Sequence, residues 1–407
     1  MVWKGTSIED AKRRFVNDRL SGEWDDMSAL CAAYGISRQA GYELMRRHKI
    51  EGLGCAVARS RAPRAHGRRV DEEIIAALVA CRQDHPTWGP RKLLAYLSRR
   101  APEVDWPAAS TIGDHLLRHG LIRLRRRKRP LIPQTRPFSD VGAPNDTWSI
   151  DFKGWARTGD GRRFDPLTVT DNHSRFLLEC RIIDPVGAAV EAAMDRLFRD
   201  VGLPVRLRAD NGSPWGARGP SGLSRTSVKW LKLGIDVEFI TPGKPQQNGR
   251  HERFHETMQA ETMDPPAATL GAQQAKFDRF RQEYNEERPH ESLGQVPPAS
   301  VYTTSARAYP RRVEDPHYEG DDVQIRRVRT NGEIKWRGDT IYVGGAFVGE
   351  LVGVLPTETG DHVVRFATVD LGLIDRATKT FQGFCPPRPG RTKARQMAKT
   401  MAGVSPM

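Results

Sequence analysis

The sequence predicts a multidomain protein in which two all-α helix-turn-helix units precede a central α/β domain with a mixed sheet, followed by a small β-barrel. Three observations indicate this fold class. A chain of 407 residues is long for one hydrophobic core. The hydrophobic pattern changes period near residues 141 and 307, and the positive charge is concentrated before residue 141. The predicted divisions are helical units at 1–53 and 70–130, a basic linker at 54–69, a core at 141–302, a β-barrel at 307–383 and a disordered basic tail at 384–407.

The net charge of +14 is distributed unevenly along the chain. Residues 1–140 contain 27 Lys and Arg against 16 Asp and Glu, a net +11, whereas 141–306 carry −1 and 307–407 carry +4. Basic ends around a neutral middle are typical of terminal domains that contact phosphates, and we expect DNA as the partner. Basic ribosomal proteins rarely contain a neutral domain of this length. Five scattered cysteines and no apolar run of the ~18–20 residues needed to span a bilayer indicate a cytoplasmic protein without a membrane partner.

The first helical unit has helix-turn-helix spacing. Ser7 begins a helix, a second helix covers Met27–Tyr34, and Gly35 turns the chain into a third helix that Ser37 caps. The third helix presents four side chains suited to phosphates or base edges, namely Arg38, Gln39, Tyr42 and Arg46. The alternative is a helical hairpin with solvated arginines.

The second helical unit covers residues 70–123. Its last helix is predicted to be capped by Ser110 or Thr111 and stopped by Gly120. Arg91 and Lys92, on the preceding helix, join Ser110 and Thr111 as predicted DNA contacts. A basic run then follows, for which a phosphate-contacting arm is favoured over a nuclear-import signal or a solvated tail. Its predicted contacts are Arg125, Arg126, Arg127, Lys128 and Arg129.

The central region changes to strand periodicity. Strands are predicted at "DTWSIDFKG", in a hairpin "FDPLTVTDNHSRFLLECRII" that turns near Asn172–Ser174, at "PVRLRAD" and at "IDVEFIT". Helices are predicted from Val190 to Val201, at "TSVKWLKLG", over 247–263 and over about 270–287. Three early strands without helices, then alternating strands and helices, indicate a mixed sheet covered by helices.

Short strands return after residue 307. Asn331-Gly332 lies between alternating stretches, which predicts a two-residue hairpin, and three further strands suggest the small β-barrel. Strand alternation sends Arg327 and Arg329 to one face, where we expect contact with DNA or with a partner subunit.

Three carboxylates stand in positions suited to chemistry. Asp151 interrupts an apolar strand, Asp210 ends another strand, and Glu252 begins a helix after a loop rich in proline and glycine. Each could be structural: Asp151 could pair with an arginine, Asp210 could form a turn with Asn211-Gly212, and Glu252 could lie on a solvated helix face. Taken singly, each carboxylate could have a structural or a catalytic role, and only the three together point to catalysis.

Five ordered motifs between residues 145 and 302 resemble the retroviral-integrase-type catalytic core of bacterial insertion-sequence transposases. The motifs are "WSIDF", "TDNHSRF", "RADNGSPW", "PGKPQQNGRHERFHETM" and "YNEERPHESLGQVPPASVY". The resemblance implies a ribonuclease-H-like fold with Asp151, Asp210 and Glu252 as catalytic residues and metal ligands. The 41 residues between Asp210 and Glu252 exceed the family's usual spacing, which fits an enlarged loop at "GARGPSGLSR". Glu256 is the rival to Glu252, and Asp171 is interpreted as a turn residue.

The resemblance also implies the chemistry. Such transposases generate 3′-hydroxyl ends at the element and join them to target DNA. Two Mg²⁺ ions, for which Mn²⁺ can substitute, would activate the attacking oxygen and stabilise the leaving oxygen. The loop would offer Lys244, Gln247 and Arg250 to DNA, and paired element ends imply a homodimer or a larger homo-oligomer. The alternatives are an inactive DNA-binding regulator and a ribonuclease-H-like nuclease without transfer activity.

Overall fold

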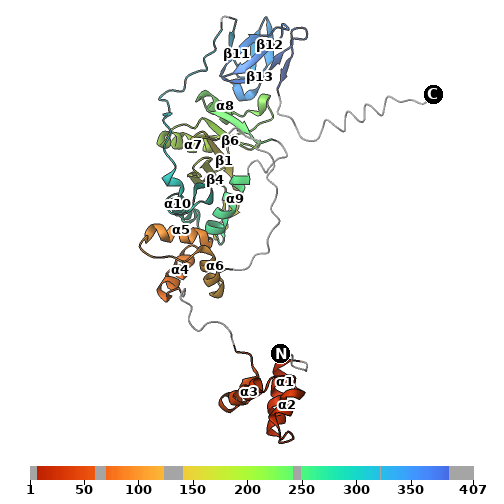
Figure 1. The fold of residues 1–407 in the computed structure, drawn as a ribbon. Helices are drawn as coiled ribbons and strands as arrows, with labels where there is room; N and C mark the ends of the chain where they lie inside the picture. Colours follow the sequence, from red (N-terminus) through yellow and green to blue (C-terminus); the bar gives the residue numbers. More distant parts are fainter. Residues whose placement is uncertain (1–6, 60–69, 123–140, 242–248, 321, 385–407) are drawn as a thin grey trace, which may run out of the picture. The chain divides into compact units, whose positions relative to one another are not determined.

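The computed structural model describes residues 7–59, 70–122, 141–241, 249–320 and 322–384. The chain forms two compact units, Met1–Asp71 and Glu72–Met407 (Figure 1). No helix within the described ranges is long and apolar enough to cross a membrane. Several predicted features lie outside these residues: most of the linker, the arm of Arg125, Arg126, Arg127, Lys128 and Arg129, the loop residues Lys244 and Gln247, and the tail from residue 385.

The first unit consists of three helices and a short 3₁₀ turn. Its elements are α1 (Ile8–Leu20), α2 (Met27–Ala33), α3 (Arg38–Glu51) and the turn η1 (Gly52–Ala56). Ser7 and Ser37 cap α1 and α3 as predicted, by accepting from the amides of Asp10 and Ala40. Cys55 and Ala56 are buried, so the packed unit extends past the predicted boundary at residue 53.

The second helical unit contains α4 (Glu72–Asp84), α5 (Pro90–Arg100) and α6 (Ala109–Arg118). Gly120 has φ +70°, and the Leu121 amide donates to the Leu116 carbonyl at 2.9 Å, so the predicted stop of α6 is confirmed. The predicted cap is wrong, because α6 begins one residue before Ser110 and Ala108 occupies the N-cap position.

This second helical unit packs on the central domain. The Tyr96 hydroxyl donates to Glu287 at 3.0 Å, Arg99 donates to the Glu287 carbonyl at 2.8 Å, and His85 lies 2.8 Å from Glu283. These partners lie at the end of helix α10 (Leu270–Glu286). The contact therefore joins α5 to the helix that closes the central domain.

The central sheet is mixed, as predicted, with strand order β5-β4-β1-β6-β7. Strand β1 is antiparallel to β4 and parallel to β6. The strands are β1 (Thr147–Phe152), β4 (Pro166–Asp171), β5 (Leu177–Ile182), β6 (Arg206–Ala209) and β7 (Asp236–Phe239). The helices are α7 (Gly187–Val201), α8 (Arg225–Lys232), α9 (Gly249–Met258), which continues into a π-helical turn at Gln259–Met263, and α10.

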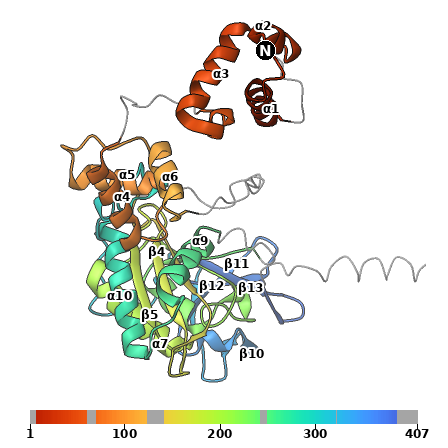
Figure 2. The same ribbon diagram turned by 90° about the horizontal axis from the view of Figure 1, so that it is seen from below.

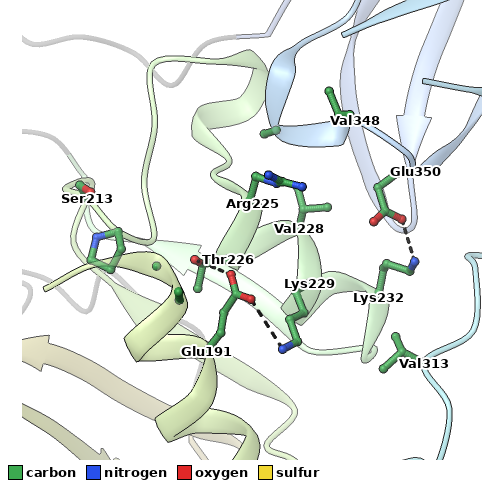
Figure 3. A pocket seen from close by; sticks show the side chains of 14 residues that line it. Glu191, Ser213, Arg225, Thr226, Val228, Lys229, Lys232, Val313, Val348 and Glu350 are labelled. Carbon is green, nitrogen blue, oxygen red and sulfur yellow. Dashed lines mark hydrogen bonds and ion pairs between the residues drawn. The ribbon is translucent and has the colours of Figure 1, made fainter. Parts of the chain in front are cut away.

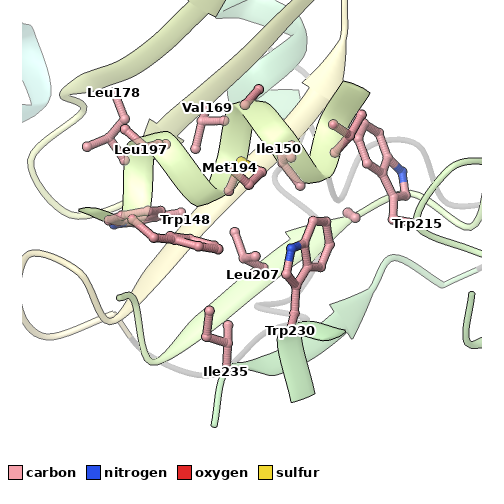
Figure 4. Close-up of a cluster of buried hydrophobic side chains, with 14 of the residues drawn as sticks. Trp148, Ile150, Val169, Leu178, Met194, Leu197, Leu207, Trp215, Trp230 and Ile235 are labelled. Carbon is pink, nitrogen blue, oxygen red and sulfur yellow. The ribbon is translucent and has the colours of Figure 1, made fainter. Parts of the chain in front are cut away.

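Two hydrophobic clusters cover opposite faces of this sheet. Trp148 and Ile150 of β1 pack with Met194 and Leu197 of α7 (Figure 4). On the other face, side chains of α9 and α10 pack on β5, along which α10 runs (Figure 2). Because side chains alternate along a strand, Asp151 points away from the α7 cluster and toward the face that α9 covers.

A small hairpin that the sequence did not lead us to expect follows β1. It consists of β2 (Ala156–Arg157) and β3 (Arg163–Phe164), with Ala156 opposite Phe164 and Arg157 opposite Arg163. Ala156 and Phe164 belong to the cluster beneath α9 and α10. The hairpin therefore lies on the same face of the sheet as Asp151.

The C-terminal region forms an antiparallel five-stranded sheet and a separate hairpin that share one core. The sheet has the order β14-β13-β12-β11-β8, and the hairpin pairs β9 with β10. The strands are β8 (Gln324–Arg327), β9 (Glu333–Trp336), β10 (Asp339–Tyr342), β11 (Leu351–Pro356), β12 (His362–Phe366), β13 (Val369–Ile374) and β14 (Phe381–Gly383).

The predicted hairpin at Asn331-Gly332 is wrong. The chain does turn there, since the Gly332 amide donates to the Arg329 carbonyl, but β8 pairs with β11 and β9 pairs with β10. The two-residue hairpin turn is instead Arg337-Gly338, where both residues have positive φ, +49° and +91°. A turn dipeptide shows where the chain reverses, whereas burial of distant partners decides which strands pair.

The C-terminal sheet packs against α8 through Val228 and Leu231, which share its core. A cleft of about 620 Å³ lies between α7, α8 and this sheet (Figure 3). Its two lysines are paired with acids: Lys229 lies 2.7 Å from Asp195, and Lys232 lies 2.8 Å from Glu350. The cleft is thus lined by neutralised charges at these positions and lies away from Asp151.

Candidate active site

The strand register brings Asp151 and Asp210 to neighbouring positions. In the parallel pairing of β1 with β6, Ser149 lies opposite Arg208. Continuing this register by two residues places Asp151 opposite Asp210, which directly follows β6. Partners in a parallel register point to the same face, and adjacent strands lie only about 4.8 Å apart. Asp151 and Asp210 therefore stand near the carboxyl ends of neighbouring strands, and Asp151 faces α9.

The Asp210 carboxylate is oriented by two hydrogen bonds. Its Oδ1 accepts from the Trp215 indole N–H at 2.5 Å and from the Gly212 amide at 3.0 Å. The predicted turn at Asn211-Gly212 is thus present. Trp215 is itself held by stacking on Phe152, the neighbour of Asp151, with ring centroids 5.5 Å apart. The local turn and the stacked rings together aim the carboxylate.

Gly212 keeps the space beside the Asp210 carboxylate open. A Cβ at this position would lie 3.1 and 3.2 Å from the two carboxylate oxygens. Together with Asp151, Asp210 offers the hard oxygen ligands that Mg²⁺ prefers. These residue types suit a divalent cation; among the described residues, the cluster of ligand atoms within 4.8 Å of one another contains Asp151 but neither Asp210 nor Glu252.

Two histidines that the sequence analysis overlooked join Asp151. His251 and His255 lie one helical turn apart on α9 and are buried. A carboxylate oxygen of Asp151 and one ring nitrogen from each histidine all lie within 4.8 Å of one another. Spacing of i and i+4 on a helix places both rings on one face, and this pattern could have identified them.

Thr168, the register partner of Asp151 on β4, connects these groups. Its Oγ1 lies 2.7 Å from Nε2 of His251 and 2.8 Å from Nε2 of His255, and it donates to the Asp151 carbonyl at 3.1 Å. Since a hydroxyl has one hydrogen and it is committed to Asp151, both histidines must donate from Nε2. Nδ1 of His251 then accepts from the Thr170 hydroxyl at 3.3 Å. We call Thr168, His251 and His255 the histidine clamp.

The clamp histidines are neutral. Burial lowers the pKa of His251 to about 3. Burial, and to a smaller extent charge repulsion from the neighbouring His251 and Lys153 when they are protonated, lowers the pKa of His255 to about 2. A neutral ring is also what the bond from the Thr170 hydroxyl to Nδ1 of His251 requires, because a protonated ring has no acceptor nitrogen. The clamp therefore anchors α9 on β4 through neutral hydrogen bonds beside Asp151.

Glu252 lies in the first turn of α9 and is exposed. It directly follows His251, so the residue beside it is fixed to β4 next to Asp151. Glu256 is also exposed and directly follows His255. Both glutamates thus adjoin a clamp histidine, and substitution of each is the way to separate their roles.

Models of known protein families match the helical, central and C-terminal parts of the chain. The family models described as "Integrase core domain" match residues 142–245 and 233–298. The model "IS481 family transposase, C-terminal domain" matches 323–382, and "Homeodomain-like domain" matches 40–116. The chain thus resembles insertion-sequence transposases with an integrase-type core.

Two relatives of the chain are insertion-element proteins. It is 29% identical over 278 residues to the 31.7 kDa protein of insertion element IS407 from Burkholderia multivorans, covering 67% of this chain and 93% of that protein. It is 29% identical over 231 residues to the 39.2 kDa protein of IS476 from Xanthomonas euvesicatoria, covering 56% of this chain and 64% of that protein.

Among solved structures, the chain is similar to the HTLV-2 integrase catalytic core domain in complex with magnesium. That match has a TM-score of 0.31 and 13% identity, and it covers 39% of this chain and 97% of that one. The catalytic core domain of BIV integrase matches with a TM-score of 0.30 and 19% identity, over 39% of this chain and 93% of that one.

Asp171 has the structural role expected for it. The buried carboxylate accepts from the Asn145 amide at 2.8 Å, from the Ser174 amide at 2.7 Å and from the Ser174 hydroxyl at 2.6 Å. It also accepts from the His173 amide at 3.1 Å. These bonds close the turn between β4 and β5, so the interpretation of Asp171 as a turn residue is confirmed.

The predicted DNA contacts of the first unit are accessible. Arg38, Gln39, Tyr42 and Arg46 are all exposed on α3, and Arg46 makes a surface ion pair with Glu43. An exposed pair of this kind contributes little to stability, so Arg46 can exchange it for a phosphate.

In the second helical unit, Arg91 and Lys92 lie on α5 and face the central domain. Arg91 makes an exposed ion pair with Glu291 at 3.0 Å. Burial and the nearby Arg288 lower the pKa of Lys92 to about 8. Ser110 is exposed in the first turn of α6, and Thr111 is half-buried.

The remaining predicted DNA contacts lie on the surface of the core and of the C-terminal sheet. Arg250 is exposed at the start of α9. Arg327 and Arg329 are exposed on either side of the buried Val328. Contact of these residues with DNA remains a prediction.

Proposed function

We propose that this protein is a DNA transposase that hydrolyses DNA at the ends of its insertion sequence to generate 3′-hydroxyl groups and then joins them to target DNA. The observation that carries the proposal is the placement of Asp151 and Asp210 near the carboxyl ends of neighbouring parallel strands, with Asp151 facing α9. Glu252, in the first turn of α9, would complete the triad. No covalent intermediate between protein and DNA is required.

The residues of the site divide the work. Asp151, Asp210 and Glu252 would hold two Mg²⁺ ions, or Mn²⁺ in their place, and such ions activate the attacking oxygen and stabilise the leaving oxygen. Trp215 and the Gly212 amide hold the Asp210 carboxylate in one orientation. The histidine clamp holds α9, and therefore Glu252, against β4. Neutral histidines add no charge that would compete with a cation.

The other domains would supply recognition. The two helical units would bind the element's terminal DNA, with α3 contacting bases and phosphates. Because both ends of an element must be joined, a homodimer or a larger homo-oligomer would assemble on DNA. Such a protein would act at the bacterial nucleoid.

A transfer assay tests the proposal. Purified protein is incubated with Mg²⁺, a DNA fragment carrying the native ends and a supercoiled plasmid, and joined products are counted. Asp151→Asn, Asp210→Asn and Glu252→Gln should each abolish joining while retaining the circular dichroism spectrum and end binding. Glu256→Gln is the matched control on α9 and should retain activity.

The two alternatives give different results in this assay. An inactive regulator would bind the ends without nicking or joining them, and a nuclease would nick DNA without joining. If Glu256→Gln is inactive while Glu252→Gln joins normally, Glu256 is the third carboxylate.

A further inference from the structure

The hairpin β2–β3 presents an exposed tryptophan close to the candidate active site. Trp155 is 61% exposed. It follows Asp151 by four residues, a length of chain that spans at most about 14 Å when fully extended. An indole left in water at this distance from a reacting centre is unusual for a soluble fold, because burying an aromatic side chain is strongly favourable.

Strand alternation gathers positive charge around this ring. Ala156 and Phe164 point into the cluster beneath α9 and α10, so Trp155, Arg157 and Arg163 share the outer face of the hairpin. The guanidinium carbons of Arg157 and Arg163 lie 5.9 and 5.6 Å from the indole centroid. Both cations are therefore within cation–π distance of a ring that remains accessible.

Arg157 and Arg163 are also direct register partners across the two strands. Like charges opposite one another destabilise an antiparallel pair. Asp165 offsets part of the charge, since Arg163 makes two hydrogen bonds to it at 2.9 and 3.0 Å. With Lys153 and Arg162 the segment 153–165 has four cations against two acids. An anion above this face would relieve the repulsion.

The hairpin is held firmly in place. Its tip donates backbone hydrogen bonds from Gly159 to the Ala267 carbonyl at 2.8 Å and from Asp160 to the Ala268 carbonyl at 2.9 Å. A Cβ on Gly159 would lie 3.2 Å from Cα of Ala268, a tight contact that glycine avoids. The aromatic face is thus presented by an anchored support and not by a loose loop.

We infer that this outer face binds a DNA strand, with an unpaired base stacked on Trp155 and phosphates beside Arg157 and Arg163. The inference rests on the proposed function, because the strand is the one that reacts near Asp151. Base stacking on an aromatic side chain tolerates any base, and arginines around the ring match the phosphates. DNA is favoured over a protein partner because a single strand supplies both a base that can stack and regularly spaced phosphates.

The test combines Trp155→Ala in the full chain with abasic sites. A single abasic nucleotide is moved along the terminal positions of the element's end, and DNA binding and joining are both measured. Trp155→Ala should weaken binding by about 5- to 150-fold, the range for loss of one stacked base. At one position the abasic end should weaken wild-type binding equally and leave binding by the variant unchanged.

Two further variants control for trivial causes. Trp155→Phe should retain most of the binding, since it keeps an aromatic face. Arg199→Ala removes an exposed arginine of α7 that lies 5.0 Å from the ring centroid of Tyr309, and it should not change DNA binding. The wild-type joining result judges the proposed function separately, because the binding scan needs no catalysis. The inference is overturned if wild type and Trp155→Ala bind with different affinity at every abasic position. It is also overturned if Trp155→Ala alters the sedimentation of DNA-free protein.

Discussion

Removal of the Thr168 hydroxyl tests whether the histidine clamp positions the glutamate-bearing helix. Thr168→Val preserves the shape of the side chain but leaves the Nε2–H groups of His251 and His255 without their acceptor. An unsatisfied buried donor costs about 1–3 kcal/mol, so the two together should destabilise the docking of α9 by about 2–6 kcal/mol. This is a large part of the stability of a domain, which is typically about 5–15 kcal/mol.

Amide hydrogen exchange in α9 is the appropriate assay, because the expected effect is local opening and not global unfolding. Thr168→Val should accelerate exchange of α9 amides by at least about 30-fold, the factor that corresponds to 2 kcal/mol. Displacement of Glu252 by as little as about 1 Å should also lower the joining rate by about 100-fold.

Two matched variants make this result specific. Thr168→Ser keeps the hydroxyl and should restore both protection and joining. Thr170→Val removes only the longer bond to Nδ1 of His251, at 3.3 Å, and should have a smaller effect. Unchanged exchange of α9 in Thr168→Val would show that the helix is held by its apolar contacts alone.

Three other perturbations have defined outcomes. Burial and the nearby cations Lys92, Arg288 and Arg175 lower the pKa of His290 to about 3, so the folded state resists its protonation. Stability from this group is present above the unfolded pKa of about 6.5 and falls by about 1.4 kcal/mol per pH unit below it. Urea titrations from pH 7 to pH 5 should therefore show a smaller loss of unfolding free energy in His290→Gln than in wild type. Gly41→Ala would place a Cβ 2.5 Å from the Cys31 sulfur and should destabilise the first unit by about 1–3 kcal/mol, measured by hydrogen exchange of α3, whereas Gly54→Ala, with nothing within 4 Å, should be neutral. Replacing both Arg327 and Arg329 with Ala should reduce strand transfer without altering end binding, measured in the transfer assay and by gel shift; a full transfer rate would show that these arginines are dispensable.

Local patterns in the sequence were sufficient for many elements. The spacing of apolar residues in α7 predicted its buried face, and Ser7, Ser37 and Gly120 marked helix ends through short-range hydrogen bonds. These features involve residues a few positions apart, so the spacing of apolar and capping residues along the chain is enough to predict them. The mixed sheet followed from the same kind of pattern, because three consecutive strands and later alternation restrict how strands can be connected.

The order of the acidic motifs was also visible in the sequence, but their surroundings were not. No pattern linked Trp215 to the Asp210 carboxylate, and Thr168 gave no sign that it would receive two histidines from a helix more than eighty residues away. The sequence likewise gave no sign that Arg91 and Lys92, predicted to contact DNA, lie on a helix that packs toward α10. A residue's type and its neighbours in the chain do not specify which distant surface it meets.

Strand pairing at the C-terminus shows the same limit. Asn331-Gly332 is a favourable turn sequence, yet β8 pairs with β11, more than twenty residues further along the chain. The free energy of a turn is small and local, whereas pairing β8 with β11 completes a sheet whose core buries Val352 and Val354. The sequence alone therefore determined most of the elements, their order and the acidic residues of the candidate site. The tertiary structure decided their partners, because pairing depends on which apolar surfaces and hydrogen-bonding groups can be buried together across long stretches of chain.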